Sequence, residues 1–353
     1  MTIFDRIVTL GHEQVALCSD PSCGYRGIIA IHSTALGPAV GGTRWWRYAT
    51  DEDALVDALR LSRGMSFKNA LAGLPLGGGK SVILGGDGPV DRAEILRAHG
   101  RAIDKYHGTY ITAEDVGTSP ADMEFIAETT AWVAGRAGTS GDPSPHTARG
   151  VFRAMQAAAL MTWETDRLNG RTVALQGCGN VGYHLAKQLH AAGARIVASD
   201  IDPERVGRVV SEFGATEAPI DAIHAVAADV FAPCALGAGL NDRTIPELKA
   251  AIVCGGANNQ LAEPRHGQVV ADRGILYIPD YVANAGGVTY GGSIEVLKLS
   301  QAETLKRVDA IYDTTLMVLD RAREFGVPPS DGADQLAMER IAKARATPAA
   351  AAG

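Results

Sequence analysis

The sequence predicts an α/β protein of two domains separated by a cleft. Short apolar runs rich in β-branched residues alternate with stretches of helical period along most of the 353 residues. A chain of this length is long enough to form two domains of ordinary size. Residues 136–146 are rich in Gly, Pro and Ser, and we expect them to link the two domains.

The first elements follow from simple local signals. Residues 27–32, GIIAIH, form a β-branched run that predicts a strand. A turn rich in Gly and Pro is expected at residues 36–44. Thr50 can then cap a helix, with Asp53 completing a capping box, and this helix is expected to end near Gly64.

Residues 64–80, GMSFKNALAGLPLGGGK, place two lysines on either side of a small apolar segment. The glycines at 77–79 are expected to let a ligand approach the backbone closely. A lysine in a cramped, partly apolar place is poorly solvated, which lowers its pKa and makes it a usable base. We therefore interpret Lys80 as a candidate base and Lys68 as a cation that holds an anionic group. The alternative is a surface loop with two solvated lysines.

A second candidate group lies further along the first domain. Residues 81–84 predict a strand, and Asp91 is expected to cap the next helix. Residues 109–118 predict a strand that runs into a loop carrying Asp115, and the Ser-Pro pair at 119–120 starts another helix. Side chains on such loops commonly face a cleft. The alternative for Asp115 is a helix cap or a solvated acid.

The second domain is organised around residues 172–200, TVALQGCGNVGYHLAKQLHAAGARIVASD. A helix is expected before it, from Thr147. Within it, a strand meets Gly177-x-Gly179-x-x-Gly182, and then come a helix and a second strand that ends at Asp200. A glycine motif in this strand–turn–helix–strand context, followed by an acid, is a strong fingerprint of a Rossmann-type dinucleotide-binding domain.

Each residue of the fingerprint has a physical role. Gly177 permits the tight turn, Gly179 lets a pyrophosphate approach the backbone, and Gly182 lets helix and strand pack closely. Asp200 can accept hydrogen bonds from the adenosine ribose and would repel a 2′-phosphate, so we prefer NAD to NADP. Arg205 keeps NADP open as an alternative. A glycine-rich turn without a cofactor is the structural alternative.

Three further strand–loop units follow, at residues 228–235, 251–261 and 275–287. Their strands end in small or amide residues, which are expected to line the ligand crevice of a parallel sheet. Cys234 is interpreted as a small buried residue of that crevice, and a nucleophile is the alternative. From Ser293 onward the pattern predicts long amphipathic helices.

Composition excludes several classes of function. A net charge of −7 argues against a nucleic-acid surface, which needs clustered Lys and Arg. No apolar run approaches the roughly 18 residues of a membrane span, and the N-terminal residues do not resemble a secretory signal. The cysteines form no CxxC pair, so we expect reduced thiols, a cytoplasmic protein and no metal site.

Several long strings resemble the family of glutamate, leucine, phenylalanine and valine dehydrogenases, and the leucine branch most. They include IIAIHSTALGPAVGGTR, DALRLSRGMSFKNALAGLPLGGGK, YITAEDVGTSPADM, QGCGNVGYHLA, GGANNQLAEPRHG and PDYVANAGGV. The resemblance covers nearly the whole chain. It implies reversible oxidative deamination, in which an L-amino acid, NAD and water give a 2-oxo acid, ammonia and NADH.

The resemblance also implies roles for individual residues. Lys68 would pair with the substrate carboxylate, Lys80 would be the catalytic lysine, and Asp115 would carry protons to and from the substrate nitrogen. Gly41, Met65 and Asn259 would contact the substrate. The cofactor would lie against Thr147, Gly177, Cys178, Gly179, Asn180, Val181, Gly182, Asp200, Ile201, Cys234, Ala235, Ala257, Asn258, Asn259 and Asn284.

The chemistry sets one condition on Lys80. Water must add to an iminium ion, which requires a base near neutral pH. Asp115 by itself would raise the pKa of Lys80, and we expect desolvation and the nearby cation Lys68 to outweigh it.

Substrate choice rests on four positions that match the side-chain pocket of the leucine branch: Val40, Ala113, Val288 and Gly291. None is charged, so glutamate should be refused. Gly291 replaces a branched residue and can make room for an aromatic side chain. Leucine-like substrates are preferred, and phenylalanine or valine is the alternative. A 2-hydroxy-acid dehydrogenase and a non-catalytic NAD-binding regulator are the competing classes.

The expected architecture follows from the same resemblance. Residues 1–135 form the substrate-binding and oligomerisation domain, rejoined by a C-terminal helix at 329–347, and residues 140–325 form the NAD-binding domain. Closure of the cleft would exclude water from the reaction. The family implies a homo-oligomer built through the first domain.

Overall fold

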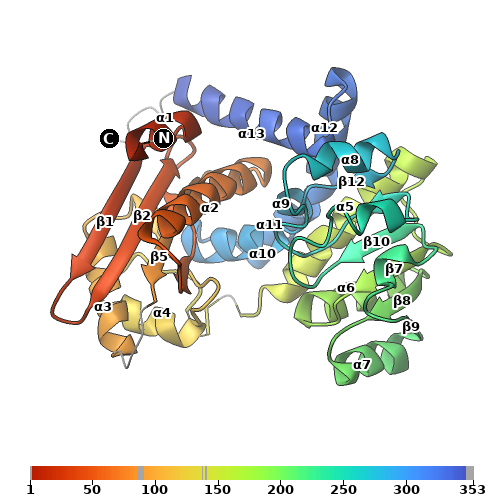
Figure 1. The fold of residues 1–353 in the computed structure, drawn as a ribbon, viewed down its shortest axis with the longest axis horizontal. Helices are drawn as coiled ribbons and strands as arrows, with labels where there is room; N and C mark the ends of the chain where they lie inside the picture. Colours follow the sequence, from red (N-terminus) through yellow and green to blue (C-terminus); the bar gives the residue numbers. More distant parts are fainter. Residues whose placement is uncertain (1, 86–90, 137, 140, 347–353) are drawn as a thin grey trace. The chain divides into compact units, whose positions relative to one another are not determined.

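The structure, a computed structural model, describes residues 2–85, 91–136, 138–139 and 141–346 (Figure 1). The chain divides into two compact units. Unit 1 comprises the residues up to Gly141, residues 291–299 and the residues from Ala337 onward, and unit 2 comprises 142–290 and 300–336. The sequence prediction did not anticipate that residues 291–299 group with unit 1. Residues 137 and 140 of the expected linker and residue 347 of the expected helix lie outside the described residues.

Unit 1 is built on one mixed sheet with helices on both faces. Its elements are α1 (Ile3–Leu10), β1 (Gln14–Asp20), β2 (Tyr25–Ser33), β3 (Ala39–Val40), β4 (Thr43–Trp46), α2 (Asp51–Leu71), β5 (Gly77–Leu84), α3 (Arg92–Asp104), β6 (Tyr110–Ile111) and α4 (Pro120–Ala127). The strand order is β1-β2-β5-β3-β6, and β4 also pairs with β5. Strands β1, β2 and β5 are antiparallel neighbours, whereas β3 and β4 run parallel to β5.

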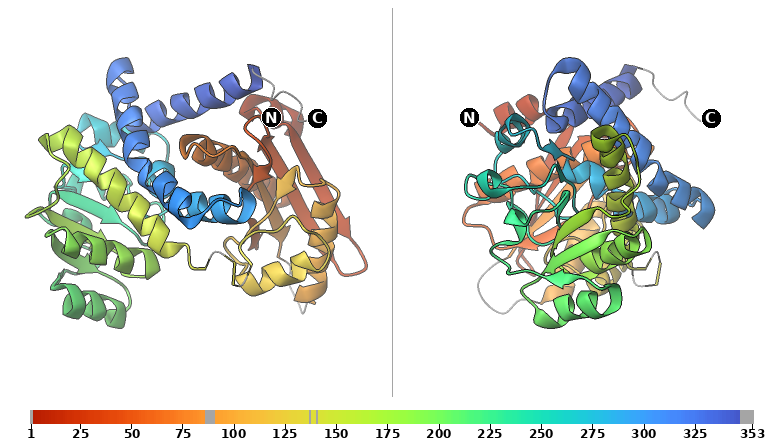
Figure 2. Two further views of the ribbon diagram at one scale, coloured as in Figure 1. Left: turned by 180° about the vertical axis from the view of Figure 1, so that it is seen from behind. Right: turned by 90° about the vertical axis from the view of Figure 1, so that its right-hand side faces the viewer.

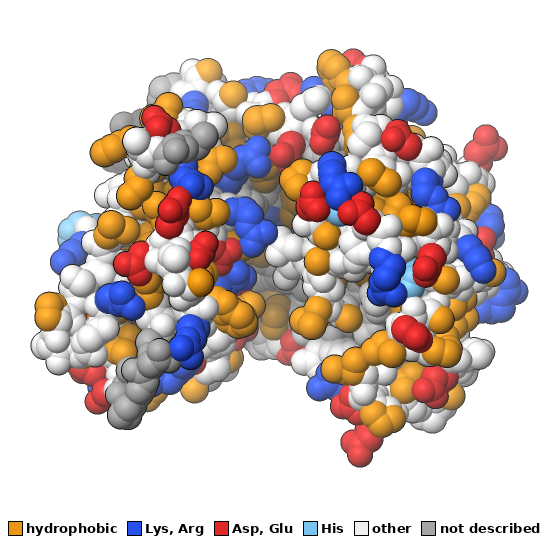
Figure 3. Space-filling view, viewed as in Figure 1, with side chains coloured by type: hydrophobic (Ala, Val, Ile, Leu, Met, Phe, Trp, Pro, Cys, Tyr) orange, Lys and Arg blue, Asp and Glu red, His pale blue; other side chains and the backbone are white. Residues whose placement is uncertain are grey.

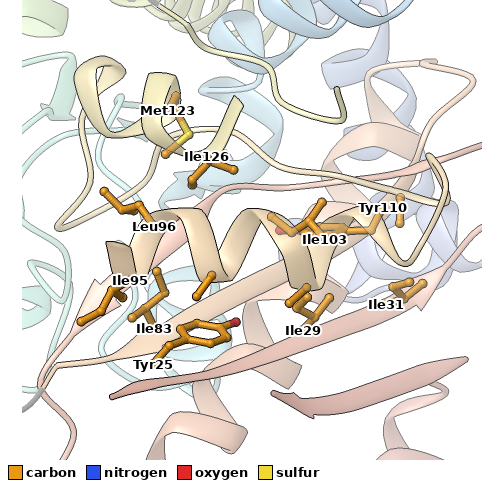
Figure 4. Packing of buried hydrophobic residues seen from close by; sticks show 13 residues of the cluster. Tyr25, Ile29, Ile31, Ile83, Ile95, Leu96, Ile103, Tyr110, Met123 and Ile126 are labelled. Atoms are coloured by element: carbon orange, nitrogen blue, oxygen red, sulfur yellow. The ribbon is translucent and has the colours of Figure 1, made fainter. Parts of the chain in front are cut away.

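The two faces of this sheet bury different side chains, because successive residues of a strand point to opposite sides. On β2, Ile28 and Ala30 pack with α2, whereas Ile29 and Ile31 pack with α3 and α4. Figure 4 shows this second cluster, with Leu96 and Ile103 of α3 and Met123 and Ile126 of α4 over Ile29, Ile31 and Ile83. On β5, the side chain of Lys80 points to the opposite face of the sheet from that of Ile83 and therefore lies on the α2 side.

The local signals locate most of these elements, with two corrections. The capping boxes at Thr50 and Ser119 and the Asp91 cap are present. The helix that starts after Thr50 does not end near Gly64 but continues to Leu71, so Lys68 lies on a helix. The residues expected as a turn at 36–44 contain β3 and the start of β4.

Unit 2 is built on a parallel sheet. Its elements are α5 (Ser144–Trp163), β7 (Thr172–Gln176), α6 (Asn180–Ala191), β8 (Arg195–Ser199), α7 (Pro203–Phe213), β9 (Thr216–Glu217), the 3₁₀ turns η1 (Ile223–Ala225) and η2 (Ile245–Glu247), β10 (Val230–Pro233), β11 (Ile252–Val253), α8 (His266–Asp272), β12 (Leu276–Tyr277), α9 (Asp280–Ala283), α10 (Gly286–Gly291), α11 (Gln301–Asp309) and α12 (Ile311–Phe325). Gly291 at the end of α10 groups with unit 1, and so do the π-helical turn η3 (Gly292–Val296) and the last turns of α13 (Pro329–Ala346).

The strand order of unit 2 is β12-β11-β10-β7-β8-β9, and every pair is parallel. Numbered from β7, this is the order 3-2-1-4-5-6 of a Rossmann fold. The predicted α/β fold with a Rossmann-type domain is therefore confirmed. The order reverses between β7 and β10, and ligands bind such sheets outside the carboxyl ends of the strands at that point. Helices α5 and α12 pack side by side in this unit (Figure 2).

The surface carries both signs of charge. Figure 3 shows acidic and basic side chains interspersed over the face it draws. Among the described residues, no helix combines the length and the apolar character needed to cross a membrane.

Candidate active site

Lys80 and Asp115 form a nearly buried ion pair in unit 1. Lys80 Nζ lies 3.0 Å from Asp115 Oδ2, and their side chains are 6% and 22% exposed. Lys80 comes from the central strand β5, and Asp115 comes from the loop between β6 and α4. That loop is held in place because the Asp115 N–H donates to Thr118 Oγ1 at 2.9 Å, and Thr118 Oγ1 donates to the Thr43 carbonyl at 2.8 Å.

A second cation contacts the same carboxylate. Arg44 Nε donates to Asp115 Oδ2 at 2.9 Å, so one carboxylate oxygen accepts from both Arg44 and Lys80. Arg44 Nη1 also donates to Asp57 Oδ2 at 2.8 Å. Asp57 is fixed in turn by Tyr48, whose hydroxyl donates at 2.8 Å, and by Arg60 at 3.0 Å. The site is therefore a line of alternating charges with the Lys80 amine at one end.

A buried polar network fixes strands β4 and β5 beneath these charges. Thr43 Oγ1 lies 2.8 Å from Ser81 Oγ, and each hydroxyl lies 3.0 Å from His99 Nε2. Tyr25 OH lies 2.7 Å from the other ring nitrogen. Burial lowers the pKa of His99 to about 3, so the ring is neutral. The network holds the residues directly before Arg44 and after Lys80 in a fixed register.

Burial lowers the pKa of Lys80 below its ordinary value of 10.5. Asp115 opposes this effect, and Arg44 adds to it, so the net direction is down. Burial raises the pKa of Asp115, but Lys80 and Arg44 together hold it below its ordinary value. The geometry thus provides a desolvated amine beside an ionised carboxylate, the combination that acid–base catalysis requires.

One expectation about the lysine stretch is corrected, and a second cation is found near Lys80. The glycines at 77–79 do not open space for a ligand, because the protein itself fills that space. A Cβ on Gly78 would lie 2.0 Å from the Ser66 nitrogen, and one on Gly79 would lie 2.7 Å from the Tyr110 ring. These glycines let β5 pack closely against α2 and β6. Arg44, which the sequence interpretation did not consider, is a neighbouring cation that lowers the pKa of Lys80.

The predicted substrate contacts Gly41 and Met65 lie close to β5. A Cβ on Gly41 would lie 1.9 Å from the Gly79 carbonyl and 3.1 Å from Met65 Cγ. The next residue, Gly42, fits as tightly against the Asp115 loop, because a Cβ on Gly42 would lie 2.9 Å from Asp115 Cβ. Lys68 is half-buried and lies one helical turn after Met65 on α2.

The predicted side-chain pocket is only partly assembled within one unit. Val40 and Ala113 belong to an apolar cluster of unit 1 that contains Leu74, Leu76, Ile111, Ala134, Trp132, Val296 and Leu297. Val288 lies on α10 in unit 2, and Gly291 begins the segment that groups with unit 1. Glu295, next to Val296 of the cluster, accepts the Gly135 N–H at 2.7 Å.

In unit 2 the glycine motif has the geometry that a dinucleotide needs. Gly177 has φ +95°, and a Cβ on Gly182 would lie 1.9 Å from the Gly177 carbonyl. Among the described residues, the only atom within 4 Å of a Cβ placed on Gly179 would be Arg205 Nη1, at 3.8 Å, so space is open at the start of α6. A cavity of about 620 Å³ lies there, lined by Cys178, Gly179, Asn180, Val181, Tyr183, His184, Arg205, Arg208 and Cys234.

Asp200 is well placed beside this turn. Its Oδ2 accepts the Cys178 N–H at 2.5 Å, and its Oδ1 accepts the Asp202 N–H at 2.9 Å. Each carboxylate oxygen keeps a further lone pair for a ribose hydroxyl. Ile201 is 85% exposed, which leaves its side chain available for contact with a base. Arg205 pairs with Asp202 at 3.1 Å.

The ends of the other strands meet the glycine turn. A Cβ on Gly177 would lie 2.9 Å from the Ala235 nitrogen, and Gly256 lies against Val181 and Cys234. Burial raises the pKa of the Cys234 thiol to about 11, so it is a neutral lining residue at physiological pH. Thr147, at the start of α5, lies against Gly286 and Gly287.

The amides at the next loop form a polar cluster. Asn284 is buried, and its Nδ2 donates to Asn258 Oδ1 at 2.8 Å. Within the described part of the chain, Asn284 Oδ1 has no hydrogen-bond partner. An unpartnered buried acceptor suits a ligand that donates hydrogen bonds, such as a carboxamide. Asn259 has φ +50°, and its N–H donates to Asp280 Oδ2, while Ala257 is buried beside it.

Sequence interpretation missed Arg44, Asp57 and Gly42. Arg44 sits in GGTR directly after the glycines, and Asp57 lies two turns into α2. The one available signal was an arginine within a short strand close to the lysine stretch. A charge in a strand that packs against a buried element needs a partner.

Two family models together match most of the chain. Residues 12–132 match the family model described as Glu/Leu/Phe/Val dehydrogenase, dimerisation domain. Residues 138–203 and 199–348 match the model for glutamate/leucine/phenylalanine/valine dehydrogenase.

Individual relatives match over nearly the full chain. A leucine dehydrogenase of Bacillus cereus is 50% identical over 97% of this chain and 94% of its own length. A valine dehydrogenase of Streptomyces coelicolor is 46% identical over 96% and 94%. The crystal structure of L-tryptophan dehydrogenase from Nostoc punctiforme superposes with a TM-score of 0.89, at 42% identity, over 98% of this chain and all of that chain.

Proposed function

The chain belongs to the glutamate/leucine/phenylalanine/valine dehydrogenase family and is an amino-acid dehydrogenase, and we propose that Lys80 and Asp115 are its catalytic residues. The observation that carries this proposal is the buried pair itself. Lys80, on the central strand of unit 1, has a lowered pKa, and its amine lies 3.0 Å from the ionised carboxylate of Asp115. Within the pair, Lys80 takes the proton from the attacking water, and Asp115 takes and returns the proton of the substrate nitrogen.

The remaining residues bind and orient the substrate. Lys68 holds the substrate carboxylate, and the Gly41 backbone, Met65 and Asn259 contact the amino acid. The bound nicotinamide supplies the acceptor for the hydride that leaves the substrate α-carbon. We propose that unit 1 is the substrate domain and unit 2 the cofactor domain.

Enzymes of this family use a nicotinamide dinucleotide, and we propose NAD for this chain. The support is the Asp200 carboxylate beside the glycine turn, which would repel the 2′-phosphate of NADP. The open space at Gly179 and the unpartnered Asn284 oxygen fit such a cofactor. The residues that would hold it are Thr147, the turn Gly177–Gly182, Asp200, Ile201, Cys234, Ala235, Ala257, Asn258, Asn259 and Asn284.

Leucine and other branched-chain amino acids are the proposed substrates. Val40 and Ala113 belong to an apolar cluster, and Glu295 adds a negative charge next to it. A glutamate side chain would therefore be buried without a partner. Valine is the close alternative, in line with the Streptomyces relative. An aromatic amino acid is a further alternative substrate, because Gly291 carries no side chain and a structural relative of 42% identity is a tryptophan dehydrogenase.

One panel tests both choices. NADH or NADPH formation is measured with leucine, valine, phenylalanine, tryptophan and glutamate, each with NAD and with NADP. We expect leucine and valine to give the highest kcat/KM with NAD, and glutamate to give none above background. A phenylalanine or tryptophan value tenfold above leucine, which requires only about 1.4 kcal/mol of differential transition-state binding, would reverse the order. Equal rates with NADP would refute the role of Asp200.

Two properties of the protein as a whole are also proposed. The match of residues 12–132 to a dimerisation domain supports self-association through unit 1. The same unit exposes the apolar side chains Phe4 and Val8 on α1 and Leu17 on the edge strand β1, at 78%, 76% and 71%. The free thiols support a cytoplasmic location.

A further inference from the structure

We propose, on the basis of the function above, that Arg44 is a positioning residue for amino-acid oxidation. Held by Asp57, it fixes the Asp115 carboxylate against Lys80 and favours loss of a proton from the Lys80 amine. Arg44 itself has no proton to give, because a guanidinium stays charged throughout the physiological range. It acts by holding its two carboxylate partners in place and by its own fixed positive charge.

The geometry of Arg44 supports a fixed role. Its side chain is 17% exposed, and it uses two different nitrogens for two different carboxylates, Asp115 at 2.9 Å and Asp57 at 2.8 Å. A guanidinium presents donors in a rigid fork, so two contacts of this kind define its orientation. Strand β4 pairs with β5, and Arg44 lies opposite Val82 in this pairing. Arg44 is therefore beside the strand that carries Lys80.

The elements packed against β5 carry several charged or titratable side chains: Arg44 on β4, Asp57, Arg60, Arg63 and Lys68 on α2, and His32 on β2, with Glu114 and Asp115 in the loop after β6. The charges that act on the pKa of Lys80 are those of Asp115, Arg44 and Asp57. Burial lowers the pKa of His32 to about 4, so it is neutral. Asp115 faces Lys80 directly, and its negative charge would by itself keep a proton on the amine.

Arg44 and Asp57 act on Lys80 with opposite signs. Beyond the dominant effect of burial, the positive charge of Arg44 lowers the pKa of Lys80, and the negative charge of Asp57 raises it. Removing Arg44 also frees Asp115 to pair with Lys80 alone, which raises that pKa further. Removing the charge of Asp57 leaves Arg44 with one negative partner fewer, which lowers the pKa of Lys80 further. A purely structural role for the two residues predicts no such opposition.

The test is the pH dependence of kcat/KM for amino-acid oxidation in Arg44→Leu, Asp57→Asn, Arg44→Lys and the wild type. The rate rises with pH as Lys80 loses its proton. We expect the midpoint of this rise to move to higher pH in Arg44→Leu, by about half a pH unit or more in a profile measured across the whole rise. In Asp57→Asn the midpoint moves to lower pH. Arg44→Lys keeps the charge, so its profile stays near wild type while its kcat drops.

Several controls make the result specific. The substrate amine titrates identically in all variants, so a shift between them reports the protein. Arg26→Met removes an exposed arginine of the same unit, which pairs with Asp51 at 3.5 Å, and should leave the profile unchanged. NMR titration of ¹³C-labelled lysine, with the Lys80 signal assigned by its loss in Lys80→Ala, follows the amine without turnover and should show the same two shifts.

The outcomes separate this inference from the proposed function. Opposite shifts in Arg44→Leu and Asp57→Asn support the inference. Unchanged profiles, or shifts in the same direction, overturn the inference. The proposed function still stands in that case if the wild type oxidises amino acids. A wild type that oxidises no amino acid refutes the proposed function instead. If Arg44→Leu does not fold, Asp57→Asn decides alone: a shift to lower pH supports the inference, and no shift overturns it.

Discussion

Lys80→Ala should abolish amino-acid oxidation while the protein still folds and binds NADH. Removing a general base costs about 10²- to 10⁴-fold in rate, and Lys80 is proposed as the base that activates water, so we expect a loss of about 10³-fold in kcat. The fold should survive because Asp115 keeps Arg44 as a partner at 2.9 Å. The measurement is NADH formation from leucine, together with the thermal midpoint and NADH fluorescence titration.

Lys105→Ala is the matched control for this variant. Lys105 is an exposed lysine of unit 1, at the end of α3, and its loss should leave kcat within about twofold of wild type. A Lys80→Ala protein that retains near-wild-type turnover would show that another group activates the water. Loss of NADH binding together with turnover would indicate a folding or cofactor defect instead.

Asp115→Asn should be nearly as damaging. The amide has the shape of the carboxylate but cannot take a proton from the substrate nitrogen, so we expect kcat to fall by at least about 10²-fold. Because Asp115 raises the pKa of Lys80, its neutralisation also lowers that pKa. The residual activity should therefore reach its plateau at lower pH than in the wild type, which a pH–rate profile measures.

Asp104→Asn serves as the control, since Asp104 is an exposed acid at the end of α3 in the same unit. It should change neither kcat nor the profile. An Asp115→Asn enzyme with more than a tenth of wild-type kcat would remove Asp115 from proton transfer. A profile that moves to higher pH would contradict the electrostatic account of the site.

Local sequence motifs were sufficient to predict much of the fold and part of the candidate site. The glycine turn at Gly177 is recognisable because all its determinants lie within one strand–turn–helix unit, and the structure shows the close approach of Gly182 that the spacing predicts. The caps at Thr50, Asp91 and Ser119 depend on neighbours three residues away and were equally readable.

Contacts between distant segments were not readable in this way. Arg44 and Asp115 are 71 residues apart, and nothing in either sequence neighbourhood announces the pair. The glycines before Lys80 were assigned to ligand access because their neighbours, Ser66 and Tyr110, come from a helix and a strand whose packing a single sequence does not reveal. The end of α2 was misplaced because Gly64 is a weak helix breaker, and the packing of α2 on the sheet outweighs its propensity.

The central claim is that the buried amine of Lys80 activates the water that attacks the reacting carbon of an amino acid. The most direct test is a crystal structure of the protein with NADH and the unreactive analogue of the 2-oxo acid of leucine. We predict Lys80 Nζ within hydrogen-bond distance of the oxo oxygen, at about 2.6–3.2 Å, with Asp115 still paired to Lys80 and Arg44. An analogue bound elsewhere, with Lys80 Nζ directed away from it, would contradict the account.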